Sequence, residues 1–376
     1  MTRYAHITGW GMAVPERVLT NHDLEQIFED ADDEWIVSRT GIRERRIADK
    51  TETTASLGTQ AALRALEGTD IKASEIDLII VATSSPEYIF PATASIVQDN
   101  IGASQAGAFD LSAACTGFIF ALNMAAQSVR SGNIDKALVI GSETLSRFVN
   151  YEDRNTAILF GDGAGAFLVE GRPEPGGVLS CVMRSDGSGG DLLSIPAGGS
   201  YMPTTTETVA KRMHYMQMNG REVFRFATRV MASATRDAID DAGIALDDVS
   251  LIVPHQANQR IIEAAARGLK VPLERFAINV DRYGNTSTAS IPIAFCEAWD
   301  QGRIRTGDNL VLVGFGAGLT WGAMALQMTM PERVVKPVDR RRSRRMRTIA
   351  KARSLTRRVG RRVESLIFRA KTGGGK

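Results

Sequence analysis

The feature that most constrains the fold is a plan of turn, helix, glycine and strand that occurs twice. The segment GFIFALNMAAQSVRSGNIDKALVIGS lies after Cys115, and TSTASIPIAFCEAWDQGRIRTGDNLVLVGFG lies after Asn285. In each, a polar turn leads into an apolar-faced helical pattern, a glycine ends the helix, and a β-branched run follows. The offset is 170 residues from Cys115 to Asn285 and again from Gly132 to Gly302. We therefore predict two related halves.

Short β-branched runs alternate with helical patterns through both halves. A second repeat pairs ASEIDLIIVATSS with ALDDVSLIVPHQ. This alternation is typical of layered α/β proteins with buried strands. The expected strands cover residues 76–83, 136–142, 165–170, 249–254 and 309–316. We divide the chain into an N-terminal half, a Gly/Ser/Pro-rich connecting segment, a C-terminal half and a basic extension, at residues 1–175, 176–219, 220–330 and 331–376.

The charge of the chain is unevenly distributed. Residues 336–376 hold 16 basic and 2 acidic residues, whereas the rest holds 29 basic and 41 acidic residues. A body with a net charge of −12 argues against nucleic-acid binding. In the extension, RTIAKARSLTRRVGRRVESLIFRAK spaces its apolar residues as an amphipathic helix would, which suits an anionic membrane or an acidic protein partner. A disordered, solvated tail is the alternative.

The cysteines and the apolar runs indicate the setting. Cys115, Cys181 and Cys296 are an odd number and lie far apart, which argues against a disulfide framework and against a zinc or other metal site. We find no secretory signal, and no apolar run reaches the roughly 18 residues that a membrane span needs. We expect a cytoplasmic, globular enzyme.

Three side chains stand where sites gather in α/β folds, at strand ends and helix starts. Cys115, in LSAACTGF, would lie at a helix amino terminus that favours thiolate, although a buried structural cysteine is the alternative. His255, in VPHQANQRI, could donate a hydrogen bond to an oxyanion or be a satisfied core histidine. Asn285, in YGNTSTAS, could supply an amide or only cap a helix. Asp162, between glycines in FGDGAGA, is interpreted as a turn residue that bonds its own backbone.

Five ordered blocks spread over residues 1–330 resemble β-ketoacyl-acyl carrier protein synthase III of the thiolase superfamily: LSAACTGF, LFGDGAGAFLVE, VPHQANQRI, RYGNTSTASIP and VGFGAGLTWGAMAL. The resemblance implies a thiolase-like five-layered αβαβα fold of two related halves, and a homodimer. It implies an acyltransferase that condenses an acyl-CoA starter with malonyl-acyl carrier protein, releases CO2 and initiates fatty acid synthesis. Acyl-CoA is then a substrate, and no cofactor is expected. A related condensing enzyme or acyltransferase of polyketide or secondary metabolism is the alternative.

The resemblance also implies roles for individual residues. Cys115 would accept the acyl group, and His255 and Asn285 would stabilise the enolate that forms when the malonyl group loses CO2. The backbone N–H groups of Cys115 and Ala317 would form an oxyanion site. Ala317 replaces the middle glycine of the family's Gly-rich loop, and its methyl group is tolerated if the backbone angles permit it.

Further roles concern binding. Without the resemblance, Trp35 is equally well a helix core residue and Arg39 a surface charge. Arg221, Arg225 and Arg229 recur every four residues and would form a cationic row on one helix face, which suits an acidic carrier protein. The implied residues are Trp35, Arg39 and Arg154 for CoA, Phe90 and Leu145 for the acyl pocket, and Arg225, Gln256, Ala257, Asn258, Gln259 and Arg260 for the carrier protein.

Two other interpretations account for less of the sequence. A thiolase would be expected to bring a second catalytic cysteine, and a hydroxymethylglutaryl-CoA synthase fits the blocks less well. A non-catalytic adaptor that acts through its basic extension would leave Cys115, His255 and Asn285 without a joint purpose.

Overall fold

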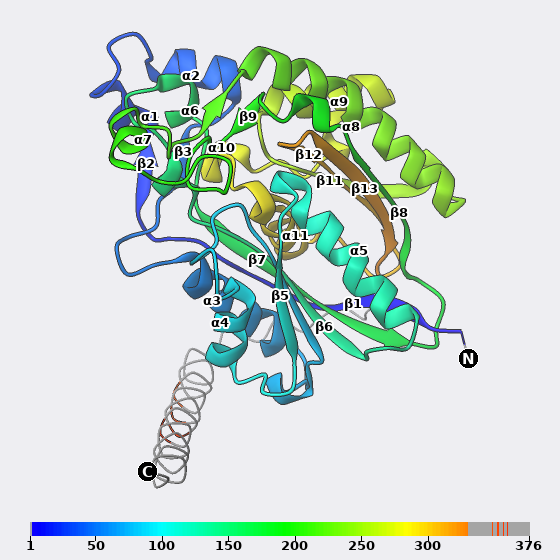
Figure 1. Cartoon of the computed structure of the whole chain (residues 1–376). Helices are drawn as coiled ribbons and strands as arrows, with labels where there is room; N and C mark the ends of the chain where they lie inside the picture. The colour runs from blue at the N-terminus through cyan, green and yellow to red at the C-terminus, as the bar shows by residue number, and fades with distance from the viewer. Residues whose placement is uncertain (1, 330–347, 349–351, 353–355, 357–358, 360–376) are drawn as a thin grey trace, which may run out of the picture.

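Five layers of helices and strands alternate in the computed structural model of the chain (Figure 1). The structure describes residues 2–329 and four later positions, residues 348, 352, 356 and 359. The predicted basic extension therefore lies almost entirely outside the described residues, and both interpretations of it stay predictions. Among the described residues, no helix combines the length and the apolar character needed to cross a membrane.

Two sheets form the strand layers. The first sheet has the order β1-β7-β6-β4-β5, and the second has the order β11-β12-β13-β8. In the first sheet, β4 runs parallel to β5 and β6, whereas β7 runs antiparallel to β1 and β6. In the second, β11 is parallel to β12, and β13 is antiparallel to β12 and β8. The bounds are β1 Tyr4–Ala13, β4 Leu78–Ala82, β5 Gly107–Leu111, β6 Lys136–Glu143, β7 Gly163–Arg172, β8 Gly177–Ser185, β11 Val249–Pro254, β12 Asn309–Gly316 and β13 Thr320–Gln327.

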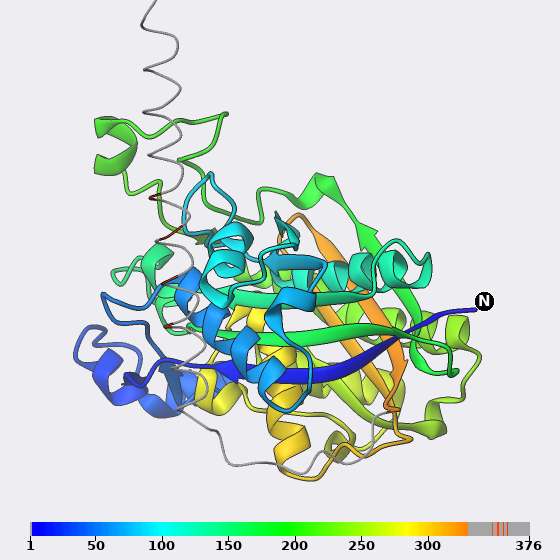
Figure 2. The ribbon, with the colours of Figure 1, turned by 90° about the horizontal axis from the view of Figure 1, so that it is seen from below.

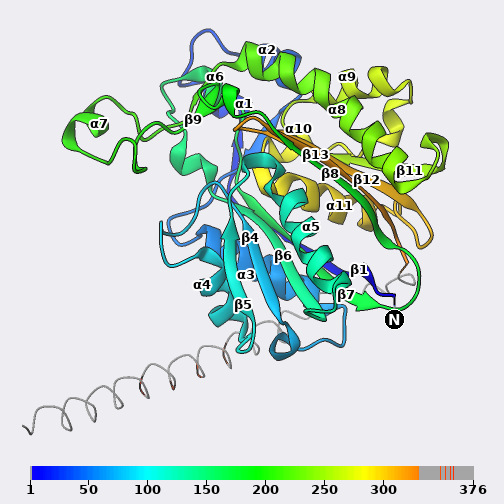
Figure 3. The same ribbon diagram turned by 45° about the vertical axis from the view of Figure 1, so that its right-hand side comes forward.

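Three pairs of helices complete the layers. In Figure 3, α3 and α4 cover the outer face of the first sheet, α5 and α11 lie between the sheets, and α8 and α9 cover the second sheet. Figure 2 shows the molecule from below, with the first sheet running across it. The bounds are α3 Thr54–Glu67, α4 Thr93–Ile101, α5 Gly117–Arg130, α8 Gly220–Ala242, α9 Gln259–Leu269 and α11 Ser290–Asp300.

Shorter elements lie at one end of the layers. The strand pairs β2–β3 and β9–β10 and the short helices α1, α2, α6, α7 and α10 connect the layers near their upper end in Figure 1. Their bounds are β2 Val18–Thr20, β3 Glu44–Arg46, β9 Leu193–Ser194, β10 Gln217–Met218, α1 Asn21–Glu25, α2 Asp33–Thr40, α6 Arg154–Ala157, α7 Thr206–Ala210 and α10 Val280–Tyr283.

The five strands expected from the sequence are confirmed as β4, β6, β7, β11 and β12. The division of the chain needs one change. Strand β8 pairs with β13 in the second sheet, although the predicted connecting segment begins at residue 176. The second layer of strands therefore extends into that segment. Its sequence, GVLSCVMRS, alternates too weakly to be distinguished from a linker.

The internal repeat is real, but its offset changes along the chain. Short 3₁₀ turns, η2 (Ala114–Thr116) and η7 (Ser287–Ala289), precede helices α5 and α11. Cys115 therefore aligns with Thr288, at an offset of 173 residues, and Asn285 lies two residues before η7. The cause is helix length, because α5 has 14 residues and α11 has 11. Aligning the glycines that follow the helices hides this difference.

An aromatic cluster at the centre joins the two central helices to the first sheet. The Phe118 ring of α5 and the Phe295 ring of α11 each pack edge-on against Phe167 of β7, with centroids 5.0 and 4.7 Å from it. All three side chains are completely buried. Such pairs contribute roughly 0.5–1.5 kcal/mol each beyond the burial of apolar area. The two central helices are thereby held at a common depth, which brings η2 and η7 together.

Candidate active site

Cys115 lies at the start of the central helix α5. Strand β5 ends at Leu111, and the turn η2 follows before α5; its first residue, Ala114, has a φ of 46°, in the left-handed region. A non-glycine residue in that region is a strained position that functional sites often retain. Cys115 is buried and lines a cavity of about 80 Å³. His255, Asn285, Gly316 and Ala317 line the same cavity, so the structure brings together all three residues predicted to be catalytic.

The electrostatic state of Cys115 differs from the expectation. Burial raises the pKa of the thiol to about 12, and the nearby Glu143 charge acts in the same direction. The sequence argument considered only the helix amino terminus, which favours thiolate. Burial removes the thiol from the solvent that would stabilise a thiolate. Burial therefore favours the protonated thiol.

His255 follows β11 directly and is completely surrounded by protein. Burial lowers the pKa of its imidazole to about 3, so the ring is neutral near pH 7. Its Nδ1 lies 2.6 Å from Ser290 Oγ, and its backbone N–H donates to Val313 O at 2.8 Å. Within the described part of the chain, its buried Nε2 has no hydrogen-bond partner. Nε2 is therefore the ring nitrogen that is available to a ligand at this cavity.

Asn285 combines both of the roles considered for it. Its Oδ1 accepts the Ser287 N–H at 2.8 Å, which caps the turn into η7. Its backbone N–H donates to Leu159 O at 2.8 Å, which ties the turn to the segment before β7. The side chain is buried and still lines the cavity. With Oδ1 engaged, the amide Nδ2 is the group that can donate to a ligand.

The Gly-rich loop after β12 approaches the cysteine closely. A Cβ atom at Gly316 would lie 2.7 Å from Cys115 N, so only glycine fits without displacement. The neighbouring Ala317 lines the cavity and is not among the residues with a left-handed φ. Its methyl group is therefore compatible with the backbone, as the sequence argument required. Cys115 and Ala317 both line the cavity, and an oxyanion site formed by their N–H groups stays a prediction.

A wider cleft adjoins the cavity. Its volume is about 890 Å³, and Trp35, Arg39, Arg221 and Arg260 are among the residues that line it. Five residues line both spaces, which makes the cleft an entrance to the cysteine: Leu159, Met218, Gly220, Phe224 and Asn258.

Trp35 and Arg154 stack on one another at the edge of this cleft. The Arg154 guanidinium lies 5.0 Å from the centre of the Trp35 ring, and Arg39 lies 5.9 Å from it on α2. Arg154 also forms an ion pair with Asp30 and donates to its carbonyl at 3.2 Å. A planar base inserted between the two groups would need one stacking distance on each of its faces, which together exceed the 5.0 Å present here. The predicted sandwich therefore requires Arg154 to move.

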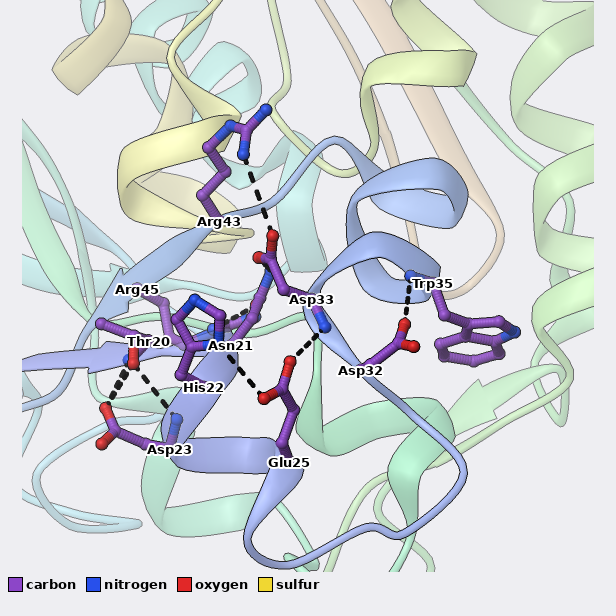
Figure 4. Close-up of polar contacts among 10 residues, drawn as sticks. All are labelled: Thr20, Asn21, His22, Asp23, Glu25, Asp32, Asp33, Trp35, Arg43 and Arg45. Carbon is purple, nitrogen blue, oxygen red and sulfur yellow. Dashed lines mark hydrogen bonds and ion pairs between the residues drawn. The ribbon is translucent and has the colours of Figure 1, made fainter.

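A polar network holds α2, and with it Trp35, in place (Figure 4). Asp32 Oδ1 accepts the Trp35 N–H at 2.7 Å and caps the helix. Asn21 donates to Asp33 Oδ1 at 2.8 Å, and its own Oδ1 accepts from the fully buried Arg45 at 2.9 Å. Arg45 further donates to Ile158 O at 2.7 Å. One buried guanidinium thus joins α1, α2 and the end of α6.

The residues predicted for the acyl pocket lie in two different environments. Leu145 is buried in a small core cluster that includes Phe160, and Phe160 lines the cavity. Phe90 is 85% exposed in the segment between β4 and α4. The resemblance assigns Phe90 to the pocket of a partner subunit, and an exposed phenyl ring is compatible with that assignment.

Among the residues predicted to bind the carrier protein, Gln256 needs a correction. It is 1% exposed, its Nε2 donates to Pro254 O and Ala277 O at 2.8 and 2.9 Å, and its Oε1 accepts the Asn279 N–H. The amide holds the site's backbone together and is inaccessible to a partner. The sequence motif alone could not separate this buried position from its exposed neighbours.

The other predicted carrier residues lie around the start of α9. Asn258 caps the helix and donates to Arg39 O at 2.9 Å, which joins the histidine segment to α2. Ala257 lines the inner cavity, and Gln259 bonds Glu263. The Arg260 guanidinium lies over the Phe224 ring at 5.3 Å, at the rim of the cleft. Arg225 is exposed and paired with Glu222.

Three polar residues had a role that the sequence analysis missed or misjudged. Ser290, which bonds His255, was read only as part of a motif. Glu143 is completely buried and accepts hydrogen bonds from Ser84, Ser85 and Thr288. Asp162 does not bond its own backbone, because its carboxylate accepts from Ala48 N and from the N–H and hydroxyl of Ser146. The place of Glu143 at the end of an apolar strand, in VIGSE, was the available signal.

Among the described residues, no group of three or more His, Cys, Asp or Glu side chains is arranged to hold a metal ion. The donor set of the cavity is a thiol, a neutral imidazole and an amide. Such a set combines a possible nucleophile with two neutral polar groups that could bind an oxyanion.

Comparison with known proteins narrows the class. Residues 109–187 match the family model 3-Oxoacyl-[acyl-carrier-protein (ACP)] synthase III, and residues 239–328 match the model of its C-terminal part. The chain is 51% identical to the β-ketoacyl-[acyl-carrier-protein] synthase III of Roseiflexus sp. (strain RS-1) over 329 residues, which are 88% of this chain and 100% of that protein.

Solved structures agree with the sequence comparison. The crystal structure of 3-oxoacyl-[acyl-carrier-protein] synthase III from Aquifex aeolicus VF5 superposes with a TM-score of 0.79 at 44% identity, covering 86% of this chain and 99% of that one. The priming β-ketosynthase of the R1128 polyketide pathway superposes with a TM-score of 0.81 at 36% identity, covering 88% and 98%. The chain belongs to the β-ketoacyl-acyl carrier protein synthase III family, and the predicted thiolase-like fold and acyltransferase class are confirmed.

Proposed function

We propose that this chain condenses an acyl group from acyl-CoA with malonyl-acyl carrier protein to give 3-oxoacyl-acyl carrier protein, the initiating step of fatty acid synthesis. One observation carries the proposal: among the described residues, the buried Nε2 of His255 has no hydrogen-bond partner, and His255, Cys115 and Asn285 line one cavity. A buried nitrogen without a partner costs free energy, and a ligand oxygen in the cavity would satisfy it.

The first half-reaction loads the cysteine. Cys115 Sγ attacks the thioester carbon of acyl-CoA, the carbon–sulfur bond to CoA breaks, and the thiol proton leaves with the CoA sulfur. The N–H groups of Cys115 and Ala317 stabilise the negative charge that develops on the carbonyl oxygen. Because CoA receives the proton, this step needs no strongly basic side chain.

The second half-reaction forms the carbon–carbon bond. Malonyl-acyl carrier protein loses CO2, and the electron pair of the broken bond becomes an enolate whose oxygen accepts from His255 Nε2–H and Asn285 Nδ2. The enolate carbon attacks the acyl-cysteine, and the cysteine sulfur departs and takes a proton from solvent. Neutral donors are well suited to this step, because they stabilise the oxygen without protonating the carbon.

Intact-protein mass spectrometry with a panel of acyl-CoA donors tests this function. We expect an acyl adduct on the wild type that malonyl-acyl carrier protein clears with release of 3-oxoacyl product. The Cys115→Ser variant should form no stable thioester adduct. Cys181→Ser is the matched control, since Cys181 is a second free thiol that does not line the cavity. Wild-type protein that stays unmodified by every donor would reject the proposal.

The entrance cleft supports the proposed recognition of CoA. Trp35, Arg39 and Arg154 would hold the nucleotide, with the adenine between Trp35 and a displaced Arg154. This assignment predicts that replacing Trp35 slows the loading of Cys115 from acyl-CoA, because the nucleotide is then bound less well. Loading from short acyl thioesters without a nucleotide should proceed as before.

The carrier protein is proposed to dock beside this cleft. Arg225 and Arg260 lie on α8 and α9, and Arg260 stands at the rim. We expect Arg260→Glu to weaken condensation with malonyl-acyl carrier protein by about tenfold, because it reverses a charge that faces an acidic partner. Loading from acyl-CoA, measured on the same preparation, should change little. Equal losses in the two half-reactions would contradict this docking surface.

We also propose a homodimer that works in the cytoplasm. Among the strands that the structure describes, β5 pairs with β4 alone, and Phe109 on β5 is 42% exposed. A sheet edge with an exposed aromatic side chain favours pairing with a second copy. The three cysteines are free, as expected of a protein in a reducing compartment.

Priming of a polyketide pathway is the second candidate. The similarity to the R1128 priming synthase favours it, whereas the greater identity to the Roseiflexus relative favours the first. The donor panel separates the two only if carrier proteins of both kinds are tested with the acylated enzyme.

A further inference from the structure

The hydrogen bonds behind His255 determine which nitrogen of its ring carries the proton. Two contacts are present at Ser290 Oγ: His255 Nδ1 at 2.6 Å, and the backbone N–H of Gln256, which donates to it at 3.3 Å. All three residues are at most 1% exposed. The Ser290 hydroxyl has one proton to donate, and among the described residues Nδ1 is the one acceptor within its reach.

The two tautomers of the ring satisfy these groups unequally. With the proton on Nε2, Nδ1 accepts from the Ser290 hydroxyl, and Ser290 Oγ accepts from Gln256. With the proton on Nδ1, Ser290 Oγ receives two N–H donors, and its own proton is left without an acceptor in a buried place. Leaving a buried donor unsatisfied costs about 1–3 kcal/mol. The first arrangement is therefore favoured.

We propose that Ser290 is a positioning residue that holds His255 in the Nε2–H tautomer, so that the ring is a hydrogen-bond donor to the enolate and not a base toward Cys115. This inference rests on the proposed function and deepens it. Phe315 supports the same orientation, because its ring packs edge-on against the imidazole with centroids 5.3 Å apart. Ser290 itself is anchored in the first turn of α11, a central helix of the fold.

Nitrogen NMR of histidine-labelled protein tests the tautomer without any substrate. The chain has four histidines, and a His255→Asn variant identifies the signals of His255 by their loss. We expect the wild type to show a protonated Nε2 and an unprotonated, hydrogen-bonded Nδ1. In Ser290→Ala, the signals should move toward a mixture of tautomers, and Ser290→Thr, which keeps the hydroxyl, should restore the wild-type pattern.

The two half-reactions supply the functional test. In Ser290→Ala, we expect loading of Cys115 to change by less than about threefold and condensation to fall roughly ten- to a hundredfold, because only the enolate step needs the Nε2 donor. Ser290→Thr should recover most of that loss. Thr235→Ala is the matched control, since it removes another buried helix hydroxyl, bonded to Met231 O at 2.9 Å.

Several outcomes would overturn the inference. A wild-type ring protonated on Nδ1, an unchanged tautomer in Ser290→Ala, or equal losses in loading and condensation would each do so. Failure of the proposed function gives a different result. The wild type would then form no acyl adduct, while the NMR experiment would still report the tautomer of His255.

Discussion

The two halves of the molecule build two equivalent places, and only one of them is a site. The catalytic place joins the helix start of the first half to strand ends of the second, through Cys115, His255 and Gly316. Its counterpart joins the helix start of the second half to strand ends of the first. The equivalent residues, which we call the counterpart cluster, are Thr288, Thr83 and Glu143.

The counterpart cluster is closed by its own hydrogen bonds. Glu143 accepts from the hydroxyls of Thr83 at 3.2 Å and Thr288 at 2.9 Å, and Thr288 also lies 2.9 Å from Ala82 O. In the catalytic place, by contrast, His255 Nε2 has no hydrogen-bond partner among the described residues, and His255 lines the cavity. One architecture therefore supports both outcomes. The side chains present at each place decide whether its polar groups form hydrogen bonds with one another or stay available to a substrate.

The largest expected effect separates the two strand ends. His255→Ala should lower the condensation rate by about 10²–10³, since it removes a donor to the enolate. Its equivalent, Thr83→Ala, should leave condensation near the wild-type rate and lower the free energy of unfolding by about 1–2 kcal/mol, through the lost bond to Glu143. Half-reaction rates and urea denaturation of both variants measure this. A catalytic defect in Thr83→Ala as large as that of His255→Ala would break the comparison.

A second pair of variants tests the close approaches of the two helix starts. A Cβ at Gly141 would lie 2.2 Å from Thr288 O, so Gly141→Ala should lower the free energy of unfolding by about 1–3 kcal/mol. A Cβ at Gly316 would press on Cys115 N, so Gly316→Ala should slow loading of the cysteine more than it destabilises the protein. Acyl-adduct formation and chemical denaturation distinguish them. The comparison fails if both variants lose stability and loading in the same proportion.

The smallest effect is a pH dependence of stability. The pKa of His255 is about 3 in the folded protein and about 6.5 in the unfolded chain, so between these values the unfolded state binds the additional proton. The stability that this group contributes is complete above pH 6.5. It decreases by about 1.4 kcal/mol for each pH unit by which the pH is lowered from 6.5 toward 3. Urea denaturation of the wild type and His255→Asn at pH 5 and 7 measures the difference. A slope unchanged in His255→Asn would contradict the burial argument.

Much of the fold could be predicted because it rests on local patterns. The five β-branched runs became strands β4, β6, β7, β11 and β12, since buried strands need continuous apolar residues. Strand β8 was not recognised, because its weakly alternating sequence becomes a strand only through pairing with β13. The offset of the repeat was correct at Gly132 and Gly302 and shifted at the helix starts, because a three-residue change in helix length leaves no local mark.

The sequence by itself determined the elements, the repeat and the residues that carry chemistry, because periodicity, glycine stops and motif order are properties of the chain. The tertiary structure decided the states of those residues. Burial sets the pKa of Cys115 to about 12 and that of His255 to about 3. Hydrogen bonds to distant segments make Gln256 a structural residue and join Ser290 to His255. Solvation and pairing depend on neighbours from every layer, and no window of sequence contains them.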